Sequence, residues 1–255
     1  MDALGCRIVR ADGFDTDQLG TFTRDIERRD SQLQTARTKA RKGMDLLGLS
    51  LGLASEGSFP ADPFIGHLPW NVEALVWLDD ESELELVGMA QGPAISVQGI
   101  AKTMDELLIL AERAEFPQHQ LTLRPNNEHD IRIRKGIATL EALQQSFVEC
   151  LDESTNRSVF VESDLRAFCN PTRQALIVRA ADDLIQKINS ICPRCSLPGY
   201  WVTEHRPGLL CAACHAPTRL AIASIWRCGK CSFSHEEAVG SEQLADPGRC
   251  DYCNP

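Results

Sequence analysis

Apolar residues recur at helical spacing in several stretches of the chain, and a capping residue precedes each stretch. Ser31 opens a stretch that Gly48 ends, while Thr103, Thr139 and Asn170 open further ones, the last running to about residue 190. The apolar face of the first stretch consists of Leu33, Ala36, Ala40, Met44 and Leu47. This periodicity predicts a series of amphipathic helices.

Shorter apolar runs between these helices predict strands. Residues 49–54 resemble a buried strand, and residues 74–78 and 84–88 flank an acidic turn, which indicates a hairpin. Another predicted strand ends at Glu162. Because helical and strand patterns alternate, we expect an α/β domain over residues 1–190, with a mixed sheet and flanking helices.

Residues 191–255 carry eight of the chain's eleven cysteines, arranged as four Cys-x-x-Cys pairs. Two cysteines on one tight turn can direct both sulfurs at a single ion, and a second turn completes a tetrahedron. The spacing C-x2-C-x15-C-x2-C, followed by C-x2-C-x18-C-x2-C, is typical of four-thiolate zinc sites. The predicted ligands are Cys192, Cys195, Cys211, Cys214, Cys228, Cys231, Cys250 and Cys253. The sequence therefore predicts a small C-terminal double zinc-ribbon domain.

The spacing leaves open which cysteine pairs share an ion. Sequential ribbons, with pairs one and two on one zinc and pairs three and four on the other, are favoured because each closes locally. An interleaved arrangement, with pairs one and three together and pairs two and four together, is the alternative. In both, four sulfurs leave no open coordination position, so the two zinc ions are expected to fold the tail and not to catalyse.

Two other interpretations of the cysteines are weaker. Disulfides need an oxidising compartment, but residues 1–10 carry charges and no apolar segment of signal length, so we expect a cytoplasmic protein. The segment from Cys211 to His215 matches the covalent haem pattern C-x-x-C-H, although the other three pairs lack the histidine.

Composition and charge narrow the possible partners. The chain is 43% hydrophobic and 24% charged, as in soluble globular proteins, and no apolar run approaches the length of a membrane span. The formal net charge is -10. Residues 191–255 hold six basic and six acidic residues, so the whole excess of 36 acidic over 26 basic residues lies upstream. This charge distribution disfavours nucleic acid as a partner.

Two stretches upstream of the cysteines offer candidate ligand-binding residues. Ser55, Glu56, Gly57 and Ser58 follow the strand predicted at residues 49–54, and small residues with one carboxylate there suit a phosphate or magnesium site. The alternative is a tight turn in which Glu56 caps backbone amides.

The second stretch surrounds the helix start at Asn170. The free amides of a helix start, with Asp164, Arg166 and Arg173 nearby, could bind a nucleotide or another small phosphate-like anion. The alternative is that these charges pair with one another. The candidates for catalytic roles across both stretches are Glu56, Asp164, Arg166 and Arg173.

Several motifs together carry a resemblance to a known family. They are Gly13-Phe-Asp-Thr-Asp17, Gly20-Thr-Phe-Thr23, Ala36-Arg-Thr-Lys-Ala-Arg41, Ala54-Ser-Glu-Gly-Ser-Phe59, Asp164-Leu-Arg-Ala167, Asn170-Pro-Thr-Arg173 and the doubled cysteine pairs ending in Cys253-Asn-Pro. The chain resembles a bacterial family of unknown function over essentially its whole length. The resemblance implies a cytosolic protein with a zinc-ribbon tail and no defined activity. It also implies a preceding strand, loop and helix that this sequence does not contain, and a histidine where Phe168 stands.

A fainter similarity links the order of helix, strand and acidic loop to the house-cleaning nucleoside triphosphate pyrophosphatases. That resemblance implies that Glu56 holds magnesium and that Arg166 and Arg173 contact phosphates, in a magnesium-dependent pyrophosphohydrolase. The usual opening phosphate loop of that family is absent from this sequence. A competing hypothesis is a non-enzymatic adaptor that docks a protein partner through the zinc ribbons.

Overall fold

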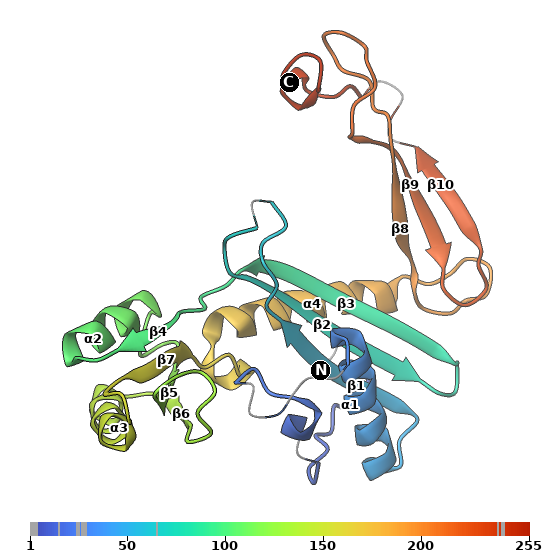
Figure 1. The fold of residues 1–255 in the computed structure, drawn as a ribbon. Coiled ribbons are helices and arrows are strands. Elements are labelled where there is room, and N and C mark those ends of the chain that lie inside the picture. The colour runs from blue at the N-terminus through green and yellow to red at the C-terminus, as the bar shows by residue number, and fades with distance from the viewer. Residues whose placement is uncertain are drawn as a thin grey trace. The chain divides into compact units, whose positions relative to one another are not determined.

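The structure is a computed structural model and describes residues 5–14, 16–23, 26, 30–64, 66–238, 240 and 243–255. Its residues group into two compact units. The larger unit comprises Ile8–Asp79 and Val87–Leu184, and the smaller is built mainly from Asp80–Leu86 and Ile185–Pro255. The predicted mixed α/β class is confirmed, with helices distributed among antiparallel sheets (Figure 1).

The first sheet has the strand order β1-β2-β3 and is covered on one face by helix α1. Its elements are β1 (Leu51–Ser58), β2 (Trp70–Asp79), β3 (Leu84–Pro93) and α1 (Gln32–Leu47). As predicted, Ser31 caps α1 by accepting a hydrogen bond from the backbone of Gln34 at 3.3 Å. Gly48 ends the helix in the left-handed conformation, with φ at 63°, which glycine adopts without steric cost.

The second sheet has the order β4-β7-β5-β6 and packs against two helices. Its elements are β4 (Gln98–Ala101), β5 (Leu121–Pro125), β6 (Arg134–Ile137), β7 (Val159–Ser163), α2 (Met104–Arg113) and α3 (Leu140–Glu153). Thr103 and Thr139 cap α2 and α3 through their side chains, as expected. The apolar core beneath the helices contains Leu107, Leu121, Leu123, Leu143 and Phe147, each almost wholly buried.

Helix α4 (Pro171–Asn189) begins where the sequence predicts. The Asn170 side chain accepts a hydrogen bond from the backbone of Arg173 at 2.9 Å, and Pro171 occupies the first helical position. The helix runs against β3 at Gly88, where a Cβ atom would lie 2.2 Å from the carbonyl oxygen of Ala180. Only a glycine allows this close approach.

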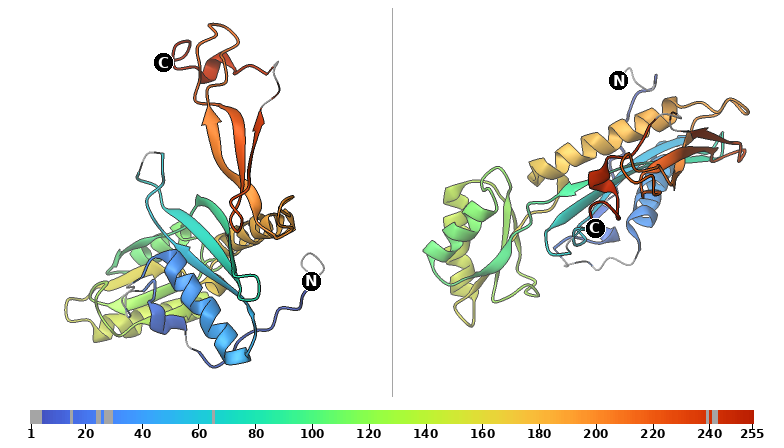
Figure 2. Two further views of the ribbon diagram at one scale, coloured as in Figure 1. Left: turned by 90° about the vertical axis from the view of Figure 1, so that its right-hand side faces the viewer. Right: turned by 90° about the horizontal axis from the view of Figure 1, so that it is seen from above.

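The tail forms a three-stranded sheet in the order β10-β9-β8, visible in Figures 1 and 2. Its strands are β8 (Tyr200–Pro207), β9 (Ala221–Cys228) and β10 (Ser234–Ala238). Both neighbouring pairs are antiparallel, and Tyr200 lies opposite Cys228 while Pro207 lies opposite Ala221. The loops that carry the cysteines therefore emerge at the two ends of one ribbon.

The structure corrects the strand predicted at residues 49–54. Strand β1 continues through Ser55, Glu56, Gly57 and Ser58, all of which pair with β2, so these residues form no loop beyond a strand end. Strand β1 also runs antiparallel to β2. Within the described residues, no helix is long and apolar enough to cross a membrane.

Candidate metal centres and buried ion pairs

The eight tail cysteines gather into two clusters of four. The first cluster contains Cys192, Cys195, Cys228 and Cys231, and the second contains Cys211, Cys214, Cys250 and Cys253. All four sulfurs of each cluster lie within 4.8 Å of one another. The predicted set of eight residues is thus brought together, but the sequential pairing is wrong and the interleaved alternative holds.

Strand register explains the interleaving. Because Tyr200 pairs with Cys228, the first cysteine pair, just before β8, lies beside the third pair, at the end of β9. The second pair follows the opposite end of β8, about 25 Å along an eight-residue strand. At that end of β8, Ala245 forms a parallel bridge with Cys211, which brings the fourth cysteine pair beside the second pair.

Each cysteine pair sits on the same kind of turn. The amide of the residue four positions after the first cysteine donates to that cysteine's carbonyl, at 2.9 to 3.1 Å. The amide donors are Ser196, His215, Ser232 and Asn254. Three of them, Ser196, His215 and Ser232, have a positive φ near 60°, which closes the turn tightly. The turn holds both sulfurs of a pair on one side.

The sulfur geometry fits a tetrahedral zinc ion. In the first cluster, Cys192 and Cys231 sulfurs are 3.7 Å apart, as are those of Cys195 and Cys228. In the second cluster the corresponding separations are 3.8 and 3.6 Å. Zinc–sulfur bonds of about 2.3 Å in a regular tetrahedron place the sulfurs about 3.8 Å apart. An ion held by four sulfurs at these distances would have no open coordination position for a substrate.

Glu56 lies inside β1, where its side chain is 4% exposed and forms an ion pair with Lys39 of α1 at 2.5 Å. Successive residues of a strand face opposite sides, so Glu56 and Ser58 point away from Ser55 and Gly57. Ser58 donates its hydroxyl to the side chain of Gln32 at 3.0 Å, whereas Ser55 is exposed. These four residues therefore do not line one pocket, and the predicted magnesium site has no support.

Arg173 forms a buried ion pair with Glu73, a residue that the sequence patterns did not single out. Its Nε lies 2.6 Å from the Glu73 carboxylate, and its Nη1 donates to the carbonyl of Leu165 at 2.6 Å. Asn71 donates to the same carboxylate at 3.0 Å. Glu73 is fully buried and Arg173 is 7% exposed. A Cβ at Gly57 would lie 2.5 Å from Arg173 Nη2, so glycine makes room for the pair.

Asp164 and Arg166 also pair with each other, at 2.5 Å. The wholly buried Asp164 carboxylate accepts two further hydrogen bonds, from the backbone amides of Arg166 at 3.1 Å and Gly136 at 3.0 Å. The Arg166 guanidinium lies 4.7 Å from the ring centre of Phe168. The alternative in which the charges pair with one another thus holds for Asp164 and Arg166, whereas Arg173 pairs with Glu73, outside the predicted set. Anion binding by these residues stays a prediction.

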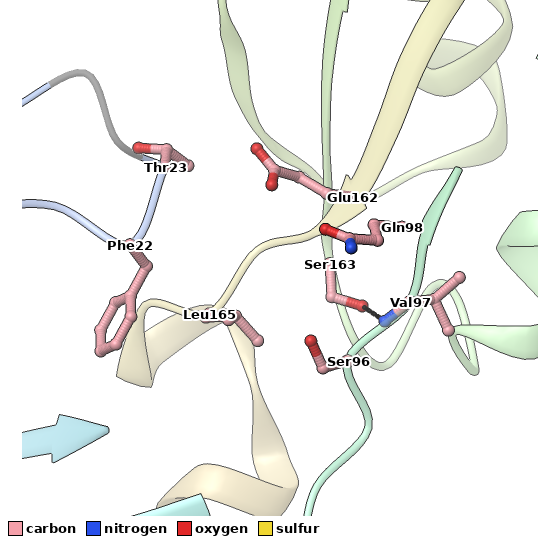
Figure 3. A pocket seen from close by; sticks show the side chains of 8 residues that line it. All are labelled: Phe22, Thr23, Ser96, Val97, Gln98, Glu162, Ser163 and Leu165. Atoms are coloured by element: carbon pink, nitrogen blue, oxygen red, sulfur yellow. Dashed lines mark hydrogen bonds between the residues drawn. The ribbon is translucent and has the colours of Figure 1, made fainter. Parts of the chain in front are cut away.

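A small polar cavity lies in the larger unit (Figure 3). Its lining residues are Phe22, Thr23, Ser96, Val97, Gln98, Glu162, Ser163 and Leu165. Its volume is about 50 Å³, which is enough for a few ordered water molecules. The Glu162 carboxylate accepts hydrogen bonds from Arg124 at 3.1 Å and Thr122 at 3.3 Å, which offsets its charge.

Burial shifts the pKa of several groups near these pairs. It raises the pKa of the Cys169 and Cys150 thiols to about 11 each, which keeps both protonated and unreactive at neutral pH. Burial also lowers the pKa of the His119 imidazole, against the opposing effect of Glu115, whose carboxylate lies 3.8 Å away. The two raised thiol pKa values are the opposite of the lowered value that activates a cysteine nucleophile.

Comparison with known proteins places most of the chain in one family. The model of a domain of unknown function, DUF6671, matches residues 39–255, which include all eight tail cysteines. No curated protein and no solved structure matches the chain.

Proposed function

The chain belongs to the DUF6671 family, and we propose that it is a zinc protein in which two structural ions fold the tail. The observation that carries the proposal is the pair of four-sulfur clusters with separations of 3.6 to 3.8 Å. Thiolates favour zinc and other soft ions over magnesium and calcium, and a complete sulfur tetrahedron is typical of structural zinc. The first cluster would hold one ion and the second cluster the other.

A structural role follows from the sparse core of the tail. Apart from cysteines, the buried apolar residues among the described residues beyond Cys192 are Leu209, Ala223 and Ala245. So few buried side chains cannot offset the conformational entropy of ordering three strands and four turns. Metal binding by four thiolates contributes on the order of 10 to 16 kcal/mol of apparent free energy, which is enough to do so.

Zinc counting with paired cysteine substitutions tests both the metal and its pairing. Cys192→Ser and Cys228→Ser belong to one cluster, so their combination should lower bound zinc from two ions per chain to one. Cys192→Ser with Cys211→Ser removes a ligand from each cluster and should leave none. Sequential pairing would instead leave no zinc in the Cys192→Ser and Cys228→Ser variant and one zinc in the Cys192→Ser and Cys211→Ser variant. Zinc is measured by atomic emission on reduced chain after dialysis against a mild chelator, and a wild-type chain without zinc would overturn the proposal.

We further propose that the zinc-ordered ribbon is a docking surface for a protein partner. Tyr200, Trp226 and Phe233 stack in a half-buried row, with ring centres 5.6 and 5.9 Å apart, and Trp201 contacts Trp226 at 6.0 Å. Half-buried aromatic side chains of this kind commonly anchor protein interfaces. The strands β8 and β10 are also edge strands, which can accept an added strand from a partner.

A photo-crosslinking amino acid at position 201 tests this docking role in living cells. One discrete crosslinked adduct is expected with the crosslinking amino acid at position 201. The adduct should disappear when Cys192→Ser and Cys211→Ser are added, because the ribbon then cannot fold. The same amino acid at the exposed Thr203 of β8 is the matched control. Equal labelling at both positions, or no adduct at position 201, would contradict the proposal.

Binding of an anionic ligand and pyrophosphohydrolase activity have less support. Asn170 and Arg173 would have to exchange existing hydrogen bonds for a ligand, because Arg173 already donates to Glu73 and Leu165. A thermal-shift screen against nucleotides and inorganic phosphate addresses this directly. A rise in melting temperature with one of these ligands, abolished by Arg173→Lys, would support an anion site at Arg173.

A further inference from the structure

The two cysteine clusters differ in how exposed their cysteine residues are. In the first cluster, Cys195 and Cys231 are half-buried and the other two cysteines are buried. In the second cluster, Cys214 and Cys253 are exposed, while Cys211 and Cys250 are buried. Since oxidation of a thiolate requires contact between sulfur and oxidant, the exposed cysteines of the second cluster are easier for an oxidant to approach than the half-buried ones of the first.

The clusters also differ in what holds their surroundings in place. The first cluster adjoins hydrogen bonds from Gly199 to Lys187 at 3.0 Å and from Tyr200 to Ser190 at 3.1 Å, which join it to the end of α4. An ion pair between Lys230 and Glu83 at 2.8 Å and the row of aromatic rings add to these contacts.

The segment that completes the second cluster, residues 243–255, has few such supports. Backbone hydrogen bonds join Ala245 to Leu210 at 2.8 Å and Ala212 to Ala245 at 2.9 Å. The ion pair from Arg219 to Asp251 is formed by side chains that are 87% and 62% exposed, and such pairs contribute little. Coordination of the proposed ion by Cys250 and Cys253 would therefore be a main link between this segment and the rest of the tail.

We propose that the second cluster is a peroxide-sensitive modification site whose oxidation releases residues 243–255 while the first cluster stays intact. The inference rests on the proposed zinc occupancy. The thiolate of Cys214 or Cys253 attacks one oxygen of hydrogen peroxide, the O–O bond breaks, and a sulfenic acid and hydroxide form. A second thiolate of the cluster displaces the sulfenic hydroxyl and forms a disulfide. The two thiolates together lose two electrons, which reduce one peroxide molecule. The two hydroxide ions formed take up two protons from solvent and become water.

The consequence is a reversible change at the end of the chain. A disulfide leaves two thiolates in the cluster, too few to retain the ion, so the contacts that hold residues 243–255 are lost. The strands β8 and β9 keep their pairing next to the first cluster, because its four sulfurs remain reduced. A dithiol reductant with zinc restores the original state.

The test uses the zinc-loaded full chain in the Cys6→Ser background, since Cys6 is exposed and would consume oxidant. Zinc release by hydrogen peroxide is followed with a coloured zinc indicator, and disulfides are located by peptide mass spectrometry. We expect two kinetic phases of one zinc each, with the first at least about tenfold faster and its disulfide within the second cluster. Equal rates, or disulfides first in the first cluster, would overturn the inference.

Two variants separate the clusters. Cys192→Ser with Cys228→Ser leaves the second cluster alone and should keep the fast phase, while Cys211→Ser with Cys250→Ser should keep the slow one. Should either variant fail to fold, the location of the first disulfide in the Cys6→Ser chain still decides the question. A chain that carries no zinc before peroxide is added contradicts the proposed function, whereas zinc released without preference contradicts this inference alone.

Discussion

Glu73 and Arg173 form an ion pair with almost no solvent contact, and the cost of breaking it can be foreseen. Removing the guanidinium leaves a buried, uncompensated carboxylate, so Arg173→Ala should destabilise the larger unit by about 3 to 5 kcal/mol. Glu73→Gln keeps a hydrogen-bond acceptor and should cost less. Urea unfolding followed by helical circular dichroism measures both. Arg179→Ala, at an exposed position of the same helix, is the control, and an equal loss there would refute the argument.

His119 should make stability depend on pH. Its Nε2 lies 2.8 Å from the Thr172 hydroxyl, and burial lowers the pKa of the imidazole, so the folded state resists protonation. The unfolded chain therefore binds the proton more readily, and stability is lost as pH falls through about 6.5, the usual histidine value. Thermal unfolding of the zinc-loaded chain at pH 7.5 and 5.5 should show a smaller decrease for His119→Gln than for the wild type. An unchanged difference would mean that other groups cause the pH dependence.

At the scale of elements, two glycines should respond to alanine with opposite signs. A Cβ at Gly88 would lie 2.2 Å from a backbone oxygen of α4, which cannot move without shifting the helix, so Gly88→Ala should destabilise by several kcal/mol, roughly as overpacking does. Gly43 lies inside α1, and its Cβ would make only an ordinary contact of 3.6 Å, so Gly43→Ala should stabilise by about 1 kcal/mol. Paired urea titrations compare them, and a loss at both positions would contradict the packing argument.

Helix boundaries could be predicted from the sequence because their causes are local. Ser31, Thr103, Thr139 and Asn170 each accept a hydrogen bond from a backbone amide three residues further on, so a short window of sequence contains the whole interaction. The second half of strand β1 could not be predicted from such local signals. Its residues Ser55 to Ser58 have low strand propensity and extend as a strand only because β2 pairs with them.

The candidate sites likewise have features that follow from local sequence and features that depend on the fold. The eight cysteines that cluster could be identified from spacing, because a Cys-x-x-Cys turn is a local structure. Their partition between two clusters depends on the register of β8 with β9, in which Tyr200 lies opposite Cys228, and no spacing rule fixes that register. Glu73 is a hundred residues from Arg173 in sequence, so the partner of this predicted site residue could be found only from the fold.

At the scale of the whole molecule, the two units should depend on metal to different degrees. The larger unit contains two apolar clusters of buried side chains, whereas the proposed source of stability in the tail is metal binding by its eight cysteines. Chelation under reducing conditions should therefore unfold the tail and leave the larger unit folded. Hydrogen exchange read by mass spectrometry should show β8, β9 and β10 losing protection while α1, α2 and α3 keep theirs, and added zinc should restore it. Protected β9 amides in the metal-free chain would mean that the ribbon folds without zinc, and exchange throughout α1 to α3 would mean that the larger unit depends on it as well.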